Sequence, residues 1–168
     1  MMTKRTLLLS LPVALLPALP AMAQDEGLYP DPSSPDASFL RVIAPEANNV
    51  TVDGTVLDPT DAGLTPYAEV SPGEVTISVG DEETTVEVGA STHYTVLSSA
   101  EAQPLIEDGV TESPAQADLL LYNLGEMESF DLYATEAETA ALSDVAPNGH
   151  DAVGLKAPLT LTFELRQD

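Results

Sequence analysis

The fold class is decided by the stretch Ser38-Phe39-Leu40-Arg41-Val42-Ile43-Ala44, in which side chains alternate between two faces. Its odd-numbered residues Phe39, Arg41 and Ile43 form one face, and the even-numbered residues that follow them form a second, wholly apolar face. Alternation with a period of two is the pattern of a β-strand, because successive side chains of a strand point to opposite sides. The stretch therefore predicts a strand from Ser38 to Ala44.

Short runs of the same kind continue along the chain, separated by residues that favour turns. Asp53-Gly54, Ser71-Pro72-Gly73 and Gly80-Asp81 are typical of turns, because proline fixes φ and glycine accepts a positive φ. Short strands at this spacing predict an all-β fold with a first β-sandwich domain over residues 38–97. The further strands expected in it are Val50–Val52, Tyr67–Val70, Val75–Val79, Thr84–Val88 and His93–Leu97.

Residues 98–116 are interpreted as a linker, because they are rich in turn residues and have little apolar periodicity. A second, shorter β domain is expected over residues 117–168. Its run from Asp118 to Leu124 resembles the Ser38 strand at an offset of 80, and Leu161 to Leu165 resembles Val75 to Val79 at an offset of 86. We expect an internal duplication whose second copy is open-edged or completed by strands from elsewhere. Residues 135–142 also fit a short helix opened by a capping box.

The first 23 residues have the pattern of a cleaved signal peptide. Lys4 and Arg5 precede an apolar stretch that is too short to span a bilayer, and Ala21-Met22-Ala23 is a typical cleavage site. A proline-rich arm over residues 24–37 follows. We therefore expect an exported, periplasmic protein.

Acidic residues dominate the composition. The chain has 28 Asp and Glu against 5 Lys and Arg, a formal charge of −23, and loss of Lys4 and Arg5 with the signal would make it −25. Such a charge repels nucleic acid and anionic lipid, and it also repels a polyuronate unless salt or a divalent cation screens it. A solvated surface in a salt-adapted organism is the simpler explanation, because the acids are scattered rather than blocked.

The sequence offers no residue that can be assigned a catalytic role. Cysteine is absent, no G-x-S-x-G elbow occurs, and only His93 and His150 could act as imidazole bases. The acidic clusters at 58–61 and 81–83 lack the spacing of an EF-hand, so neither a metal site nor a cofactor is expected. We expect a protein that is not an enzyme.

The arm and first strand together carry a resemblance to a known family. Leu28-Tyr29, a run of prolines and Ser38-Phe39-Leu40-Arg41-Val42 resemble the start of the mature alginate O-acetylation accessory proteins of the AlgF family. The likeness covers residues 28–97 and, more loosely, 118–165. It implies a periplasmic adaptor that works with periplasmic acetyltransferases and a membrane-bound O-acyltransferase. The short second unit and the acidity depart from that pattern and favour protein partners. The polysaccharide itself is a further candidate partner.

Four residues are candidates for partner binding: Tyr29, Ser38, Phe39 and Arg41. Arg41 has two interpretations, pairing with a nearby carboxylate or anchoring a partner or a sugar carboxylate through bidentate hydrogen bonds. Tyr29 suits packing on the domain edge, a protein interface or carbohydrate stacking. Two other functional classes stay open: a carbohydrate-binding β-sandwich, and an export or chaperone factor that acts by strand addition.

Overall fold

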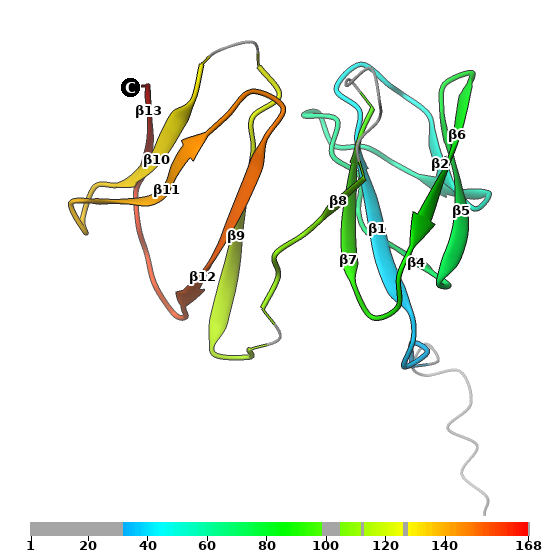
Figure 1. Ribbon diagram of the computed structural model, residues 1–168, viewed down its shortest axis with the longest axis horizontal. Coiled ribbons are helices and arrows are strands. Elements are labelled where there is room, and N and C mark those ends of the chain that lie inside the picture. The colour runs from blue at the N-terminus through cyan, green and yellow to red at the C-terminus, as the bar shows by residue number, and fades with distance from the viewer. Residues whose placement is uncertain (1–31, 99–104, 112, 126–127, 168) are drawn as a thin grey trace, which may run out of the picture. The chain divides into compact units, whose positions relative to one another are not determined.

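The computed structural model describes residues 32–98, 105–111, 113–125 and 128–167 (Figure 1). These residues form thirteen strands and no helix, which confirms the all-β expectation. From Ser33 onward they belong to one compact unit. The predicted signal peptide and most of the proline-rich arm lie outside the described residues. Within the described ranges, no helix has the length and apolarity needed to cross a membrane.

One sheet is built around the strand that the sequence pattern identified. Its central strand β1 (Ser38–Ile43) pairs antiparallel with β4 on one side and parallel with β7 on the other. The fourth strand, β8, pairs antiparallel with β7. The order is β4 (Ala68–Val70), β1, β7 (His93–Leu97), β8 (Leu105–Glu107).

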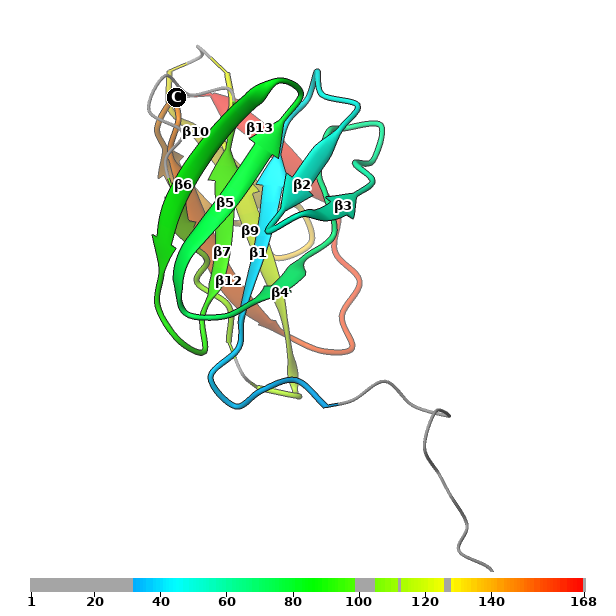
Figure 2. The same ribbon diagram turned by 90° about the vertical axis from the view of Figure 1, so that its right-hand side faces the viewer.

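A second four-stranded sheet contains only antiparallel pairs. Its order is β3 (Thr55–Leu57), β2 (Val50–Val52), β5 (Gly73–Val79), β6 (Glu82–Val88). The predicted Asp53-Gly54 turn joins β2 to β3, with φ of 47° and 76° at its two residues. Positive φ at both positions is the requirement of the tightest hairpin turns. Figure 2 shows β5 and β6 in front of β1 and β7.

A hydrophobic core lies between these two sheets. Leu40 and Val42 of β1 are fully buried, together with Val75 of β5 and Val96 of β7. Complete burial of one such side chain contributes about 1.5–3 kcal/mol. The inner residues of β1 are the even-numbered ones, as the alternation predicted, so Phe39 and Arg41 lie on the opposite face. Strands β1 to β8 thus form a β-sandwich, here called the N-terminal strand group.

Part of the predicted linker belongs to this sandwich. Strand β8 lies within residues 98–116 and pairs with β7, and Asp108 after it is buried. The linker interpretation is wrong at these positions. A strand of three residues is too short to have a recognisable apolar period, which is why the sequence pattern did not identify it. The division into two domains stays a prediction.

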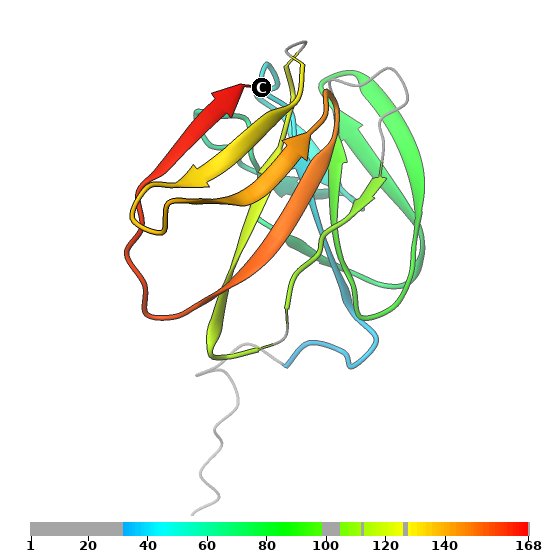
Figure 3. The ribbon, with the colours of Figure 1, turned by 60° about the vertical axis from the view of Figure 1, so that its left-hand side comes forward.

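The remaining five strands form two smaller sheets, here called the C-terminal strand group. One sheet has the order β11 (Thr139–Val145), β10 (Phe130–Ala134), β13 (Phe163–Gln167), and the other pairs β12 (His150–Lys156) with β9 (Gln116–Tyr122). Leu132, Leu142 and Val145 form its small core. Figure 3 shows β13, in red, beside β10, and among the described residues β10 is the one strand that pairs with it.

The strand orders of the two groups support the predicted duplication. The order β11-β10-β13 repeats β3-β2-β5, and β12-β9 repeats the antiparallel pair β4-β1. Pairing corrects the offsets, however. Leu165 faces Leu132 as Ile77 faces Val52, an offset of 88 rather than 86, and β13 excludes Leu161. In β9, Leu119 and Leu121 pack against the core. An offset of 80 from the buried residues of β1 predicts positions 120 and 122 instead, so the predicted register is wrong by one residue.

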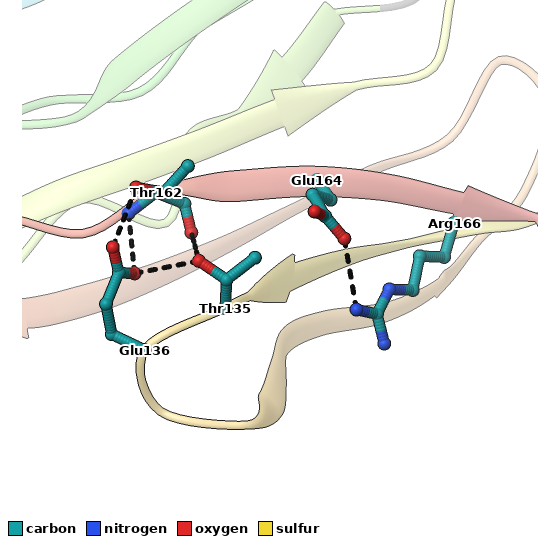
Figure 4. A network of polar contacts seen from close by, with 5 residues as sticks. All are labelled: Thr135, Glu136, Thr162, Glu164 and Arg166. Carbon is teal, nitrogen blue, oxygen red and sulfur yellow. Dashed lines mark hydrogen bonds and ion pairs between the residues drawn. The ribbon is translucent and has the colours of Figure 1, made fainter.

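The alternative helix at 135–142 is not formed. Residues 135–138 make a turn, and β11 begins at Thr139. The Glu136 carboxylate accepts hydrogen bonds from the Thr162 backbone N–H (2.8 Å), the Thr162 hydroxyl (2.7 Å) and the Thr135 hydroxyl (3.0 Å), as Figure 4 shows. The bonds from Thr162 come first among the causes that lower the pKa of Glu136 to about 2. A residue interpreted as part of a capping box instead fixes the start of β13 to the β10–β11 turn.

Candidate functional site

Arg41 lies on the face of β1 that points away from the core. It is directly opposite Thr95 in the parallel pair formed by β1 and β7. Because the fully buried Leu40 and Val42 flank it, alternation fixes the direction of the Arg41 side chain. Its Nε donates a hydrogen bond to Thr95 Oγ1 at 3.0 Å, and its Nη2 donates one to the Tyr122 hydroxyl at 3.0 Å. The guanidinium is thereby held by β7 and by the end of β9.

Asp108 is the acceptor on which these groups converge. It is 5 % exposed and follows β8 directly. Its Oδ2 accepts hydrogen bonds from the Tyr67 hydroxyl (2.6 Å) and the Thr95 hydroxyl (2.8 Å), and its Oδ1 accepts one from Tyr122. The five residues Arg41, Tyr67, Thr95, Asp108 and Tyr122 are called the Arg41 cluster below.

The positive and negative charges of the Arg41 cluster are linked through hydroxyl groups. The Thr95 and Tyr122 hydroxyls each accept a hydrogen bond from Arg41 and donate one to Asp108. A hydroxyl has one proton to donate, and in both residues it is donated to the carboxylate. Among the described residues the one ion pair within 4.0 Å is Arg166–Glu164. The expectation that Arg41 pairs with a carboxylate is therefore met only indirectly, through two bridging hydroxyls.

Aromatic rings extend the site beyond the hydrogen bonds. The Arg41 guanidinium carbon lies 4.5 Å from the centroid of the Tyr67 ring and 5.6 Å from that of Tyr122, which are cation–π distances. The His93 ring is stacked on Phe39 at 4.9 Å and meets the Tyr67 ring edge-on at 5.2 Å. Phe39, Tyr67 and His93 are all only partly buried. They form an aromatic patch next to the guanidinium.

Both tyrosines of the cluster have a raised pKa. Burial is the main cause for Tyr67, followed by its hydrogen bond to the Asp108 carboxylate, which favours the neutral phenol. The pKa of Tyr122 is raised by the same two effects in the same order. Each phenol therefore keeps its proton at neutral pH and stays a hydrogen-bond donor to Asp108.

The four residues predicted to bind a partner have different fates. Phe39 and Arg41 are brought together with the aromatic patch. Ser38 is fully buried, where its hydroxyl donates to the Gly89 carbonyl (2.6 Å) and accepts from the Thr92 N–H (3.1 Å). It has no surface to offer a partner, so its role is structural, which corrects that expectation. Tyr29 lies outside the described residues.

The sequence pattern did not single out Tyr67, Thr95, Asp108 or Tyr122. Tyr67 and Thr95 lay in or next to expected strands without a mark of their own, and Asp108 lay in the expected linker. One signal was available: the alternation of β7 places Thr95 on the same face as His93. The alternation could have marked that face of β7 as partly polar, but it could not show that the face lies beside Arg41.

Metal ligands do not gather in the part of the chain that the structure describes, where no group of three or more His, Cys, Asp or Glu side chains has a metal-binding arrangement. The Asp108 carboxylate instead bonds directly to three hydroxyl groups. In a nucleophilic triad the carboxylate orients an imidazole, and the imidazole takes the hydroxyl proton. The Arg41 cluster is arranged to fix side chains in place.

Comparison with known proteins identifies the relatives of this chain. The family described as "Alginate O-acetyl transferase AlgF" matches residues 6–163. A protein of Pseudomonas fluorescens named "Alginate biosynthesis protein AlgF" is 26 % identical over 144 residues, which are 79 % of this chain and 62 % of that protein. The chain thus spans less than two thirds of the length of that relative. Because the family match covers nearly the whole sequence, the chain belongs to the AlgF family.

Proposed function

We propose that this protein is a non-catalytic accessory protein for the O-acetylation of alginate or a similar exopolysaccharide. The names of the family and of the Pseudomonas fluorescens relative support the pathway. The proposed role is to hold the acetylation proteins in position while they modify the polymer. The word transferase in the family description is the competing assignment, and the experiments below separate the two.

The observation that carries a non-catalytic role is the mutual bonding within the Arg41 cluster. The Thr95 hydroxyl donates its hydrogen bond to a carboxylate rather than to an imidazole, and the hydroxyls of both tyrosines do the same. A phenol whose pKa is raised loses its proton less readily, so Tyr67 and Tyr122 are weaker nucleophiles than a free tyrosine. The same bonds join β1, β7, the segment after β8 and the end of β9. This is the arrangement expected of a rigid support.

Charge favours a protein rather than the polymer as the bound molecule. A chain of formal charge −23 repels a polyuronate, and screening by salt weakens this repulsion without reversing it. The aromatic patch of Phe39, Tyr67 and His93, next to a guanidinium, has the composition of the centre of a protein interface. The proposed partners are periplasmic acetyltransferases and a membrane-bound O-acyltransferase, and the proposed location is the periplasm.

Deletion of the gene in the producing organism tests the pathway. We expect polymer of normal yield with acetyl esters lost, measured by NMR of the purified polysaccharide, and recovery when the wild-type gene is returned. Unchanged acetyl content in the deletion strain would refute the role in acetylation. If the purified protein transferred or hydrolysed acetyl groups at a catalytic rate, the non-catalytic assignment would be wrong.

A pair of surface variants tests the patch. Phe39→Asp places a charge beside His93, whereas Val56→Asp places the same charge on β3, at a residue that is 67 % exposed. We expect Phe39→Asp to lose co-purification of an acetyltransferase and to lower acetylation in the complemented strain, with Val56→Asp like wild type. Circular dichroism of both variants confirms that they fold. Equal behaviour of the two variants would remove the patch as the contact surface.

A further inference from the structure

The Arg41 guanidinium uses only one of its two bidentate edges within the chain. Its Nε and Nη2 donate to Thr95 Oγ1 and to the Tyr122 hydroxyl, and these two oxygens lie 3.0 Å apart. Acceptors so close together must both lie along the edge that Nε and Nη2 share. The opposite edge, made by Nη1 and the second N–H of Nη2, is here called the free edge of Arg41. Among the described residues, Nη1 donates no hydrogen bond.

The free edge reaches solvent. Arg41 is only partly buried, and within the described part of the chain no buried side-chain nitrogen or oxygen lacks a hydrogen-bond partner. Because Nη1 has no such partner, it is not a buried atom. Exposed N–H groups bond to water, and an acceptor on another molecule can take the place of that water.

The guanidinium is also held in one orientation before anything binds. Its carbon lies 4.5 Å from the centroid of the Tyr67 ring, and Thr95 and Tyr122 fix the edge opposite the free one. Both hydroxyls are fixed in turn by Asp108, which is buried. A long side chain that is already ordered loses little further conformational entropy on binding, so the free edge is preorganised for a ligand.

A carboxylate is the ligand that fits the free edge. Guanidinium and carboxylate are both planar and can form two parallel N–H···O bonds. Arg41 is the only Lys or Arg between residues 6 and 155, so the site has one positive charge and suits a single negative charge better than a phosphate of about −1.5 to −2. Asp108 does not neutralise that charge by direct contact, because hydroxyl groups lie between the two.

The surroundings of the guanidinium favour a carboxylate from a protein over one from a uronate chain. The partly buried rings of Phe39, Tyr67 and His93 lie next to it, and neutral contacts of this kind exclude water around an ion pair. A protein can bring one acidic side chain among neutral neighbours. A polyuronate brings a carboxylate on every sugar, and all but one of them would meet a chain of formal charge −23.

We propose that the free edge of Arg41 binds the carboxylate of an Asp or Glu side chain on the acetyltransferase that contacts the aromatic patch. Nη1 and Nη2 each donate to one carboxylate oxygen, while the bonds to Thr95 and Tyr122 stay in place. The inference rests on the proposed function, because it names the chemical group that the partner brings to the same surface. Through Arg41 the partner is then connected to Asp108 in the interior.

Chemical modification of arginine tests the free edge without any partner. Phenylglyoxal reacts with the two terminal nitrogens of a guanidinium, which in Arg41 form the free edge. Arg166 is the internal reference, because its side chain is 48 % exposed. We expect both arginines to be modified in the purified chain, as read from peptide masses. Resistance of Arg41 under conditions that modify Arg166 would overturn the inference.

The same reagent shows what covers the free edge. In complex with a purified acetyltransferase of the producing organism, Arg41 should lose its modification while Arg166 still reacts. An oligouronate added instead, at saturating concentration, should leave Arg41 reactive. Protection of Arg41 by the oligouronate and not by the acetyltransferase would assign the edge to the polymer and overturn the proposal of a protein carboxylate.

A matched pair of variants measures the contribution of the planar fork. Arg41→Lys keeps the positive charge but cannot form two parallel bonds, so its Kd for the acetyltransferase should rise about tenfold or more. Arg166→Lys should leave Kd unchanged, and circular dichroism checks that both variants fold. Equal Kd values for wild type and Arg41→Lys would overturn this inference alone. If the acetyltransferase did not bind the wild-type chain, the proposed function would fail together with it.

Discussion

Replacement of Asp108 by Asn removes the charge at the centre of the Arg41 cluster while it keeps the size of the side chain. The carboxylate accepts three hydroxyl hydrogen bonds, whereas the amide oxygen of Asn can serve only the Tyr67 and Thr95 side or the Tyr122 side. The amide NH₂ then faces a hydroxyl that needs an acceptor. Arg41 also loses the negative charge to which Thr95 and Tyr122 connect it.

The magnitude follows from the number and kind of these bonds. A hydrogen bond to a charged acceptor contributes about 1.5–3 kcal/mol, and a neutral one about 0.5–1.5 kcal/mol. One bond is lost and two become neutral, and because both tyrosines are half-buried, water replaces part of what is lost. We expect Asp108→Asn to lower the free energy of unfolding by about 3 kcal/mol. With a urea m-value of about 2 kcal/mol/M, the midpoint falls by about 1.5 M.

Urea unfolding followed by circular dichroism measures this shift. Asp58→Asn is the matched control, because Asp58 is exposed, and such a surface change shifts stability by about 0.5 kcal/mol or less. If the two variants had the same midpoint, the Arg41 cluster would contribute nothing to stability. The proposal of a rigid support built on Asp108 would then fail.

Three further changes have defined outcomes. Tyr67 has a pKa raised above its usual 10. Its stabilising contribution is therefore complete below pH 10 and is lost as the pH rises above that value. The free energy of unfolding, measured from pH 8 to pH 11, should fall less steeply with pH in Tyr67→Phe than in wild type. Glu136 has a pKa lowered to about 2 from 4.5, so its contribution to stability is complete above pH 4.5 and disappears as the pH falls to 2. Between these pH values the free energy of unfolding should fall less in Glu136→Gln than in wild type. Parallel plots of unfolding free energy against pH would contradict the bonds to Thr162. Gly63→Ala should lower the free energy of unfolding by about 2 kcal/mol more than Gly80→Ala. Both glycines have positive φ, but a Cβ at Gly63 would lie 2.3 Å from Pro45 Cα, whereas a Cβ at Gly80 meets nothing within 4 Å. Equal Tm values for the two variants would refute the steric argument.

Periodicity in the sequence predicted the strands with alternating faces and the turns between them. Strands β1, β2, β5, β6 and β7 follow from a period of two, and the Asp53-Gly54 turn follows from its need for positive φ. No sequence pattern within β1 or β7 predicts that these two strands pair in parallel. Which strands pair depends on which of their faces pack into the same core. Strand β8 was too short to have a period.

Only part of the candidate site could be predicted from the sequence. Arg41 was identified because a basic residue within an apolar strand is unusual in so acidic a chain, and Phe39 because it belongs to the run that resembles the family. Asp108 was not, because one acid among 28 has no distinguishing pattern before the fold buries it. Tyr122 depends on the end of β9 approaching β7, and spacing along the chain does not encode that approach. The duplication was detected as a period, but its register needed the pairing of β10 with β13.

The parallel pair of β1 and β7 constrains the order in which parts of this chain can fold. Phe39 pairs with His93, so the central strand of its sheet waits for a partner more than fifty residues downstream. Contacts between residues far apart in sequence slow folding, because the intervening segment must be ordered first. A nascent chain that ends before Leu97 therefore leaves one edge of β1 unpaired, and the hairpins of the other sheet form ahead of it. The surface that carries Arg41 is consequently among the last parts of the N-terminal strand group to be assembled.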